Sequence, residues 1–518
     1  MNLGAMARFD RLAWWAWLAL LVAIPVTSFP WVEATIGGET VSPLSLLPLL
    51  LLIAWLVRYL RRGGSLPLAL RPLLLFGLLA AVSSAASLML PLGPYKGQTV
   101  LTRSFHGMAT LAIGLCFYAC ATLLPSDPAR LRSSLRAIYA GGILTLLWSS
   151  IQAVYVLRPI RQVPWGLNEI HRLFSVRDLF ANRVTGLAYE PSWLGDQMVV
   201  LYLPLWLASI ATGYSITLKW RKLPILELAL AAWGAAILVL AESRISVAGM
   251  LLSFGLFGAW LLWRLAGRVV DRAPAAVLRR WPLRGIFPRV LALVLGLVVF
   301  VLLAMGVLGL SATTDWRIRR VFSLPGEVAA LRAEYPFELG YAIADRAAFA
   351  ERVVYWRAGF SAFERYPVLG VGVGNAGFLF EDGLPTFGYR LEEIRRVLNP
   401  ENLSFPNPKS LWIRLLAETG IVGTSAFLTW TVLMSGTAYA LARTSAVETR
   451  LAGVAALLAL PAWILEGFSL DTFALPQTWI LLGLLTATAW KGRQSATAEE
   501  PAAVRLPSGP TAGRQSLA

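Results

Sequence analysis

The chain has 518 residues, of which 57% are hydrophobic and only 14% are charged. A soluble protein of this length carries roughly a quarter charged residues, so the composition excludes a soluble enzyme and a disordered chain. The net charge of +17 does not by itself indicate a nucleic-acid partner, because membrane proteins concentrate Lys and Arg in their cytoplasmic loops. Cys116 and Cys120, with only 2 histidines in the chain, give no zinc-ligand pattern.

Apolar blocks of about 17–25 residues, long enough to cross a bilayer as helices, recur along the whole sequence. We therefore expect an all-α polytopic membrane protein with about twelve transmembrane helices and one large extracytoplasmic loop between the ninth and tenth. The expected spans are Leu12–Phe29, Val41–Val57, Pro72–Leu90, Met108–Leu124, Ala137–Leu157, Trp193–Thr212, Leu223–Ala241, Ile245–Trp263, Val290–Leu310, Leu415–Leu441, Leu451–Leu465 and Phe473–Trp490.

The basic residues orient these spans. With the N-terminus in the cytoplasm, 25 Lys and Arg fall inside and 21 outside, and 13 of the latter lie in one long segment, 311–414. Long loops are largely exempt from the positive-inside rule, so the short loops decide the orientation. We expect one membrane domain over 1–490 with both termini cytoplasmic, the segment 311–414 outside, and a disordered cytoplasmic tail over 491–518.

Two arginines lie in segments that this topology places outside. Arg244 stands in the short link between the seventh and eighth spans, and Arg352 opens an amphipathic segment that includes Trp356 and Gly359. Arg244 can be a helix-end charge or a partner of Glu242. Alternatively, both guanidinium groups form an anion site at the outer membrane boundary, gripping a lipid-linked phosphate with little competition from water.

Glu190 precedes the sixth span and is followed by Pro191, and Arg183 lies nearby in the same outer loop. An acid and a proline are typical of a helix start. Beside a phosphate clamp, Glu190 would instead serve as the base for an acceptor sugar hydroxyl. Tyr355 and Trp356 are candidates for stacking on sugar rings.

Glycines mark two further outer features. Gly370, Gly372 and Gly374 form a Gly-x-Gly-x-Gly run that predicts a tight turn, since no strand–turn–helix context supports a nucleotide site. In the tenth span, Gly420 and Gly423 are expected to admit a neighbouring helix. Glu418 in the same span is interpreted as a structural hydrogen-bonding group within the membrane.

Together these motifs resemble the superfamily of O-antigen ligases and O-antigen polymerases, bacterial membrane glycosyltransferases of surface polysaccharides. The resemblance covers about residues 183–423. It rests on Ser243-Arg244, on Arg352 with Trp356 ahead of Pro367-x-x-Gly370-x-Gly372, and on Leu411-x-x-x-Leu415-x-x-Glu418-x-Gly420-x-x-Gly423.

The resemblance implies an inner-membrane enzyme that moves an oligosaccharide from an undecaprenyl-pyrophosphate carrier to an acceptor at the outer face. The acceptor would be another glycan, a lipid A core or a protein, and neither a metal, another cofactor nor a nucleic acid is implied. Arg244 and Arg352 would hold the pyrophosphate, with Arg183 and Lys409 as further contacts. Ligases of the family usually have His-Asn where this chain has Lys409-Ser410, which favours a polymerase or a divergent transferase.

Two other classes fit twelve spans. A secondary transporter or lipid-linked-glycan flippase built from two six-helix halves should have a long cytoplasmic link after the sixth span, where this chain has only 213–222. A sugar transferase that uses a polyprenyl monophosphate would need a metal-binding acidic pair in the first outer loop. Residues 30–40 there offer only Glu33 and Glu39.

The orientation is directly testable. A topology reporter fused near Phe337 or Tyr389 should signal from outside the cell, and one near Ala275 from the cytoplasm. A cytoplasmic signal from the Tyr389 fusion would contradict the site hypothesis, because the arginines and the lipid-linked donor must share one side of the membrane.

Overall fold

The computed structural model describes residues 3–36, 41–158, 162–217, 224–272 and 286–499. Within these ranges the chain is helical with no β-strand beyond three isolated bridges, which confirms the all-α expectation. Four predicted features fall on other residues: Glu39 in the first outer loop, parts of the inner loops at 218–223 and 273–285, and the tail over 500–518. These lie outside the described residues.

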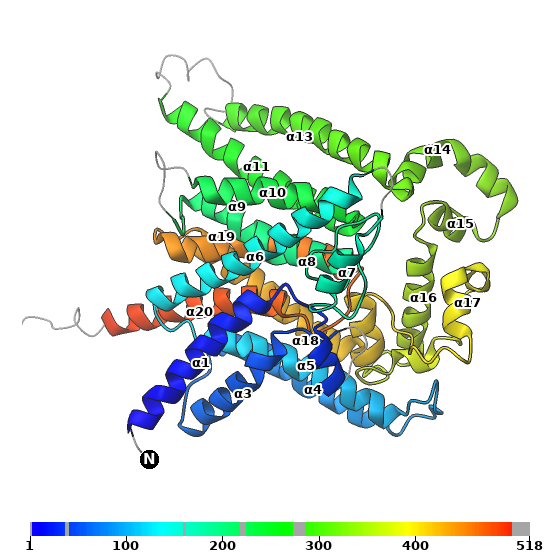
Figure 1. Cartoon of the computed structure of the whole chain (residues 1–518), viewed down its shortest axis with the longest axis horizontal. Helices are drawn as coiled ribbons and strands as arrows, with labels where there is room; N and C mark the ends of the chain where they lie inside the picture. Colours follow the sequence, from blue (N-terminus) through cyan, green and yellow to red (C-terminus); the bar gives the residue numbers. More distant parts are fainter. Residues whose placement is uncertain (1–2, 37–40, 159–161, 218–223, 273–285, 500–518) are drawn as a thin grey trace, which may run out of the picture.

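Each of the twelve segments expected to span the membrane forms a helix (Figure 1). Helix α20 continues to Glu499, past the start of the segment that was expected to be disordered. The apolar pattern of the sequence alone did not show where this helix ends. The bounds are α1 Leu3–Ala23, α2 Pro30–Ile36, α3 Leu46–Arg61, η1 Leu68–Leu70, α4 Arg71–Ser87, α5 Val100–Leu123, α6 Pro128–Val156, α7 Trp165–His171, α8 Pro191–Gln197, η2 Met198–Tyr202, α9 Leu203–Thr212, α10 Ile225–Ala241, α11 Arg244–Arg272, α13 Ile286–Thr314, α14 Trp316–Glu334, α15 Leu339–Arg346, α16 Ala350–Arg365, η3 Ala376–Leu379, η4 Thr386–Arg390, α17 Glu392–Leu398, α18 Leu411–Ala442, α19 Val447–Glu466 and α20 Pro476–Glu499.

Length and composition support a multi-pass membrane protein. Among the described residues, 8 helical segments are long and apolar enough to cross a bilayer. The other four expected spans, in α1, α3, α10 and α20, are helical but shorter or more polar. The qualifying segments are Leu68–Ser87, Val100–Leu123, Pro128–Val156, Pro191–Thr212, Arg244–Asp271, Ile286–Thr313, Leu411–Ala442 and Val447–Glu466.

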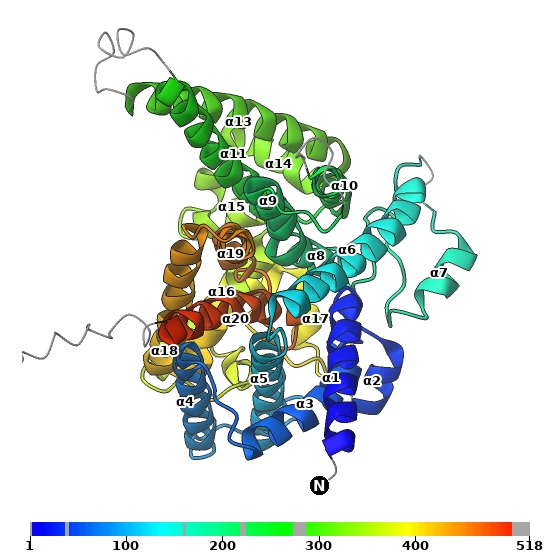
Figure 2. The same ribbon diagram turned by 90° about the vertical axis from the view of Figure 1, so that its left-hand side faces the viewer.

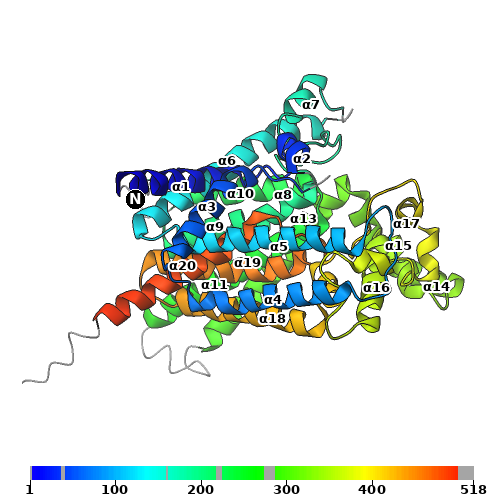
Figure 3. The same cartoon turned by 90° about the horizontal axis from the view of Figure 1, so that it is seen from below.

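The long helices run side by side, and the helices of the expected outer segment gather at one end of the bundle. Figures 1 and 3 both show α14, α15, α16 and α17 at this end, while the N-terminus and the end of α20 lie at the opposite end. Along the bundle, α11 and α13 project at one edge (Figure 2). The hydrophilic segment therefore forms a cap on one end of the helices.

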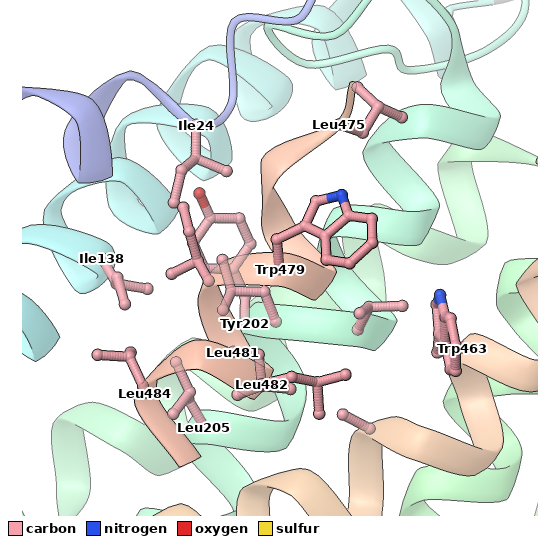
Figure 4. Packing of buried hydrophobic residues seen from close by; sticks show 14 of the residues in the cluster. Ile24, Ile138, Tyr202, Leu205, Trp463, Leu475, Trp479, Leu481, Leu482 and Leu484 are labelled. Carbon is pink, nitrogen blue, oxygen red and sulfur yellow. The ribbon is translucent and has the colours of Figure 1, made fainter. Parts of the chain in front are cut away.

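The core is built around the segment 191–212, where α8 and α9 are joined by the π-helical turn η2. Its apolar window is 89% buried, the highest share among the 8 segments. Tyr202 and Trp206 are fully buried, and Gly142 of α6 and Gly234 of α10 face their rings so closely that a Cβ would lie within 3 Å. Figure 4 shows Tyr202 among leucines of α20 and Ile138 of α6. Small residues thus let these helices approach.

Helix α13 contrasts with this core, because none of its apolar window is buried. Leu302 and Leu303 are about two-thirds exposed (66% and 65%), and α11 is the helix on which α13 mainly packs. An uncovered apolar helix of this length is stable in a lipid environment rather than in water. The exposed face of α13 therefore indicates a lipid-facing edge.

The expected outer loop is a folded helical cap. Helix α16 confirms the amphipathic segment predicted after Arg352, whereas α14, α15 and α17 were not predicted. A separate hydrophobic cluster holds the cap together; its largest members are Tyr355, Phe380, Phe387 and Ile394. The cap is thus a rigid support for side chains at the end of the bundle.

Helix α18 is broken at Gly420, whose φ of 60° and ψ of −167° are not helical. The Gly-x-Gly-x-Gly turn enters this break: Val371 N–H donates to the Ala417 carbonyl at 2.9 Å, and Gly372 N–H donates to Glu418 at 2.9 Å. A Cβ on Gly420 would overlap the carbonyl of Val368. Gly420 therefore admits a loop rather than the neighbouring helix that we expected. The nearest group to a Cβ on Gly423 would be the Thr419 side chain of its own helix.

This geometry predicts that Gly420→Ala will sharply lower the yield of folded protein, because the added methyl group meets backbone and the required φ is positive. Gly436→Ala is the matched control: Gly436 lies in the same helix and has no atom within 4 Å of a built Cβ. Its replacement should be neutral or slightly stabilising. Equal yields and melting temperatures for the two variants would contradict the role assigned to Gly420.

Candidate functional site

Arg244 joins the membrane helices to the cap. Helix α10 ends at Ala241 and α11 begins at Arg244, so the link is as short as predicted. Its Nη1 and Nη2 donate to the carbonyl oxygens of Ala347 and Ala348, each at 2.6 Å. These two alanines lie between α15 and α16. The guanidinium group therefore faces the cap.

Arg352, in the first turn of α16, reaches in the opposite direction. Its Nη1 donates to the carbonyl oxygen of Ser469 at 2.9 Å and to that of Lys409 at 3.2 Å. Ser469 belongs to the turn between α19 and α20, and Lys409 lies two residues before the start of α18. Arg352 thus ties the cap to two membrane helices.

The structure brings the two arginines together. The charge of Arg352 acts on Arg244, as does that of a third arginine, Arg317. No carboxylate of the described residues lies within ion-pair distance of Arg244 or Arg352, although Asp315 and Glu351 are close enough to act on Arg244. Carbonyl oxygens orient a guanidinium group without cancelling its charge. The site therefore has positive charge left for an anionic ligand.

The carbonyls that hold these arginines come from a strained backbone. Four described residues other than glycine have a positive φ, and three of them lie here. Such residues cost about 1–3 kcal/mol each and are concentrated at functional sites. Glu242 (φ 49°) accepts from Arg317, Ala348 (φ 51°) from Arg244, and Lys409 (φ 49°) from Arg352.

Arg317 was not predicted from the sequence. Asp315 caps α14 and is ion-paired with Arg317, with 2.7 Å between Oδ2 and Nη2, and its side chain is only 1% exposed. An Asp before a helical segment is an ordinary N-cap signal. That signal was overlooked because it lies within a long hydrophilic stretch. Arg317 is thus neutralised by a carboxylate, unlike Arg244 and Arg352.

Arg183 lies within electrostatic range of Arg317, and Glu190 lies near Arg183. Burial and the charge of Arg317 lower the pKa of Arg183, whose guanidinium stays protonated at neutral pH. The charge of Glu190 acts on Arg183, but the Glu190 carboxylate is ion-paired with Arg177, with 2.5 Å between Oε1 and Nη1. Glu190 also occupies the N-cap position of α8, with Pro191 as the first helical residue. The helix-start interpretation of this pair is therefore confirmed.

Lys409 is held in place by two partners from the cap. Its Nζ is ion-paired with Glu393 and lies 4.2 Å from the centre of the Tyr355 ring. Burial opposes the charge of Glu393, but Lys409, Tyr355 and Arg352 together hold the pKa of this carboxyl below its ordinary value. Burial and the nearby Glu393 raise the pKa of Tyr355. Glu393 was not among the predicted site residues.

The two predicted aromatic residues are largely packed. Tyr355 is 1% exposed and contacts Phe380 with ring centroids 5.2 Å apart. Trp356 meets Phe349 edge to face at 5.2 Å, and its indole N–H has no hydrogen-bond partner among the described residues. Tyr355 therefore offers little surface for stacking, whereas Trp356 keeps an unused donor.

Glu418 is buried in α18 and accepts a hydrogen bond from Nε of Arg414 at 2.9 Å. Arg414 in turn donates to the carbonyl of Asp471 at 2.6 Å. A charged pair inside the bundle, with both members hydrogen-bonded, joins α18 to the turn before α20. This geometry agrees with the structural role predicted for Glu418.

The described residues contain no group of three or more His, Cys, Asp or Glu side chains that could hold a metal ion. Two carboxylates near the arginines are paired with cations: Asp315 with Arg317, and Glu393 with Lys409.

Comparison with known proteins gives one family. Residues 229–428 match the family model described as O-antigen ligase, whereas no curated protein matches the chain. The matched range includes Arg244, Arg352 and Lys409 and ends within α18, while Arg183 and Glu190 lie before it. The part of the chain that carries the two carbonyl-anchored arginines is therefore similar to the O-antigen ligase family.

Proposed function

We propose that this chain is a metal-independent glycosyltransferase of the O-antigen polymerase or ligase type. It moves an oligosaccharide from an undecaprenyl-pyrophosphate carrier to an acceptor. One observation carries the proposal: Arg244 and Arg352 lie near each other, each anchored by carbonyls and neither paired with a carboxylate of the described residues. The family match supports a role in surface-polysaccharide assembly.

The chemistry requires positive charge at this position. As the bond between the anomeric carbon and the pyrophosphate breaks, its electron pair stays on the phosphate oxygen, and negative charge builds up there. Arg244 and Arg352 supply charge-assisted hydrogen bonds to that oxygen, and their carbonyl anchors hold them oriented before the ligand arrives. Partial burial strengthens this stabilisation, because water competes less for the donors.

The membrane supplies the other half of donor binding. The polyprenyl chain lies in the bilayer and the pyrophosphate at the end of the bundle beneath the cap. In the proposed topology twelve helices span the bacterial inner membrane, and the cap lies on its outer face. The gathering of α14–α17 at the end opposite the N-terminus supports this arrangement (Figure 3).

On the acceptor side we propose Arg183 and Lys409 as further phosphate contacts and Trp356 as a contact to sugar. The ring of Tyr355 packs against the ammonium group of Lys409. The reaction also needs a group that takes the proton of the acceptor hydroxyl, a role for which the sequence suggests Glu190, beside Arg183. The acceptor is another glycan, a lipid A core or a protein; a polymerase uses the first of these.

The paired arginines give a quantitative test. Replacing Arg244 or Arg352 with Ala removes a charge-assisted bond worth about 2–4 kcal/mol in the transition state, or roughly 30- to 1000-fold in rate. Lys should rescue only partly, because an ammonium lacks the planar fork. Since both groups act on one pyrophosphate, the double Ala variant should raise the activation free energy by less than the sum of the increases in the two single variants. The measurement is glycan transferred per unit of folded protein.

Arg357→Ala is the control, because Arg357 lies on the same helix but is exposed and ion-paired with Glu364. It should keep nearly full activity. If both single variants at Arg244 and Arg352 retain more than about a third of the wild-type rate, the pyrophosphate clamp is wrong.

Because arginines supply the charge that a metal otherwise would, purified protein should remain active in excess chelator. Transfer of glycan is measured with and without the chelator, and then after addition of Mg²⁺. Activity that disappears with chelator and returns with Mg²⁺ would overturn the metal-independent mechanism.

A further inference from the structure

Glu393 is a carboxylate that Lys409 connects with Arg352. It lies in the first turn of α17, and its Oε1 is ion-paired with Lys409. The carbonyl of Lys409 accepts a hydrogen bond from Arg352, so one residue contacts both the arginine and the carboxylate. The charge of Arg352 also acts directly on Glu393. Glu393 therefore belongs to the arginine cluster even though α17 is remote from it in sequence.

The surroundings keep Glu393 ionised. The charged groups that act on it are Lys409, which precedes α18, and Arg352 of α16, while the Tyr355 hydroxyl of α16 also favours its ionised form. All three favour the carboxylate over the carboxylic acid. A group that must accept a proton has to start unprotonated, and Glu393 meets this requirement.

Glu393 is also within reach of a substrate. Its side chain is 43% exposed, compared with 1% for the nearby Tyr355 residue as a whole. An acceptor hydroxyl coming from the solvent side can therefore approach the carboxylate while the pyrophosphate lies against Arg352. Glu190 has similar exposure, at 37%, but the groups that contact or act on it belong to Arg177, Arg183 and Ser192.

The backbone at Lys409 adds an independent observation. Its φ of 49° is rare for a residue with a side chain. Asn407 supports this conformation, since its side-chain oxygen accepts from the Lys409 N–H at 3.0 Å. The strained turn directs the carbonyl to Arg352 and the ammonium to Glu393 at the same time. Strain that is maintained in this way points to a functional arrangement.

We propose that Glu393 is the base that takes the proton of the acceptor hydroxyl, a role that rests on the glycosyl transfer proposed above. The acceptor oxygen forms a bond to the anomeric carbon as the bond from that carbon to the pyrophosphate breaks. The electron pair of the broken bond leaves with the pyrophosphate, and the hydroxyl proton moves to the Glu393 carboxylate. Solvent later removes the proton from Glu393.

The ion pair gives this step a second effect. Once Glu393 is protonated it no longer neutralises Lys409, so the ammonium becomes available to the pyrophosphate at the moment when negative charge builds up there. Proton acceptance and stabilisation of the leaving group are thus coupled through one lysine. This coupling also explains why a lysine is useful next to the base.

Glu393→Gln tests the role, with Glu392→Gln as the matched control. Glu392 is the preceding residue, is 80% exposed at its side chain and pairs only with Arg396 of its own helix. Glu393→Gln should lose at least 100-fold in transfer rate while binding the lipid pyrophosphate as tightly as wild type or more tightly. Glu392→Gln should match wild type in both measurements. Arg352→Ala, in contrast, should lose donor binding.

Chemical rescue separates a base from a structural group. Glu393→Ala should be nearly inactive and should recover part of its rate when formate is added, because formate can occupy the space and accept the proton. Glu190→Ala should show no such rescue. If Glu393→Gln misfolds, Glu393→Asp keeps the charge at a shorter reach and should transfer glycan slowly with normal donor binding.

The outcomes are distinguishable. A Glu393→Gln enzyme within about threefold of the wild-type rate overturns the assignment, as does formate rescue of Glu190→Ala but not of Glu393→Ala. Undiminished donor binding and transfer in Arg352→Ala would instead contradict the proposed function itself, whatever Glu393 does.

Discussion

The site depends on arginines that are oriented by backbone carbonyls rather than by carboxylates. A carboxylate would fix a guanidinium group and also neutralise it, whereas a carbonyl fixes it and leaves the charge for a ligand. Ala348 and Lys409 can present their carbonyls to Arg244 and Arg352 only because their backbone adopts the left-handed conformation. The strain of these residues, about 1–3 kcal/mol each, must be offset by the surrounding fold.

That fold is the junction between the cap and the bundle. The break in α18 receives the Gly-x-Gly-x-Gly turn, which fixes the cap on the membrane helices. The turn between α19 and α20 is held by Leu411, whose N–H donates to the Gly467 carbonyl at 2.7 Å, and by Arg414 through Asp471. The same turn supplies the Ser469 carbonyl to Arg352. The contacts that hold the helices together and those that position Arg352 therefore belong to one network.

Sequence reasoning anticipated the parts of this network that follow from local patterns. Apolar length marked the helices, and two outer arginines without an obvious lipid role marked Arg244 and Arg352. The folded cap was missed because α14 and α17 each bury one residue, Ile318 and Ile394, so neither shows a clear apolar pattern in the sequence. Glu393 was missed because its pairing with Lys409 depends on how α17 packs, and Asp315 because its N-cap signal lies within a long hydrophilic stretch. A positive φ at Ala348 or Lys409 has no signature in residue type, and Gly420 marks a break only once the entering loop is known.

The central claim is that one pyrophosphate lies between Arg244 and Arg352 while both arginines keep their carbonyl anchors. A structure determined in lipid with a short-chain polyprenyl pyrophosphate tests it most directly. We expect phosphate oxygens within about 3 Å of both guanidinium groups, with the bonds to Ala348 and Lys409 retained. A pyrophosphate bound elsewhere, or contacted by only one of the two arginines, would contradict the account.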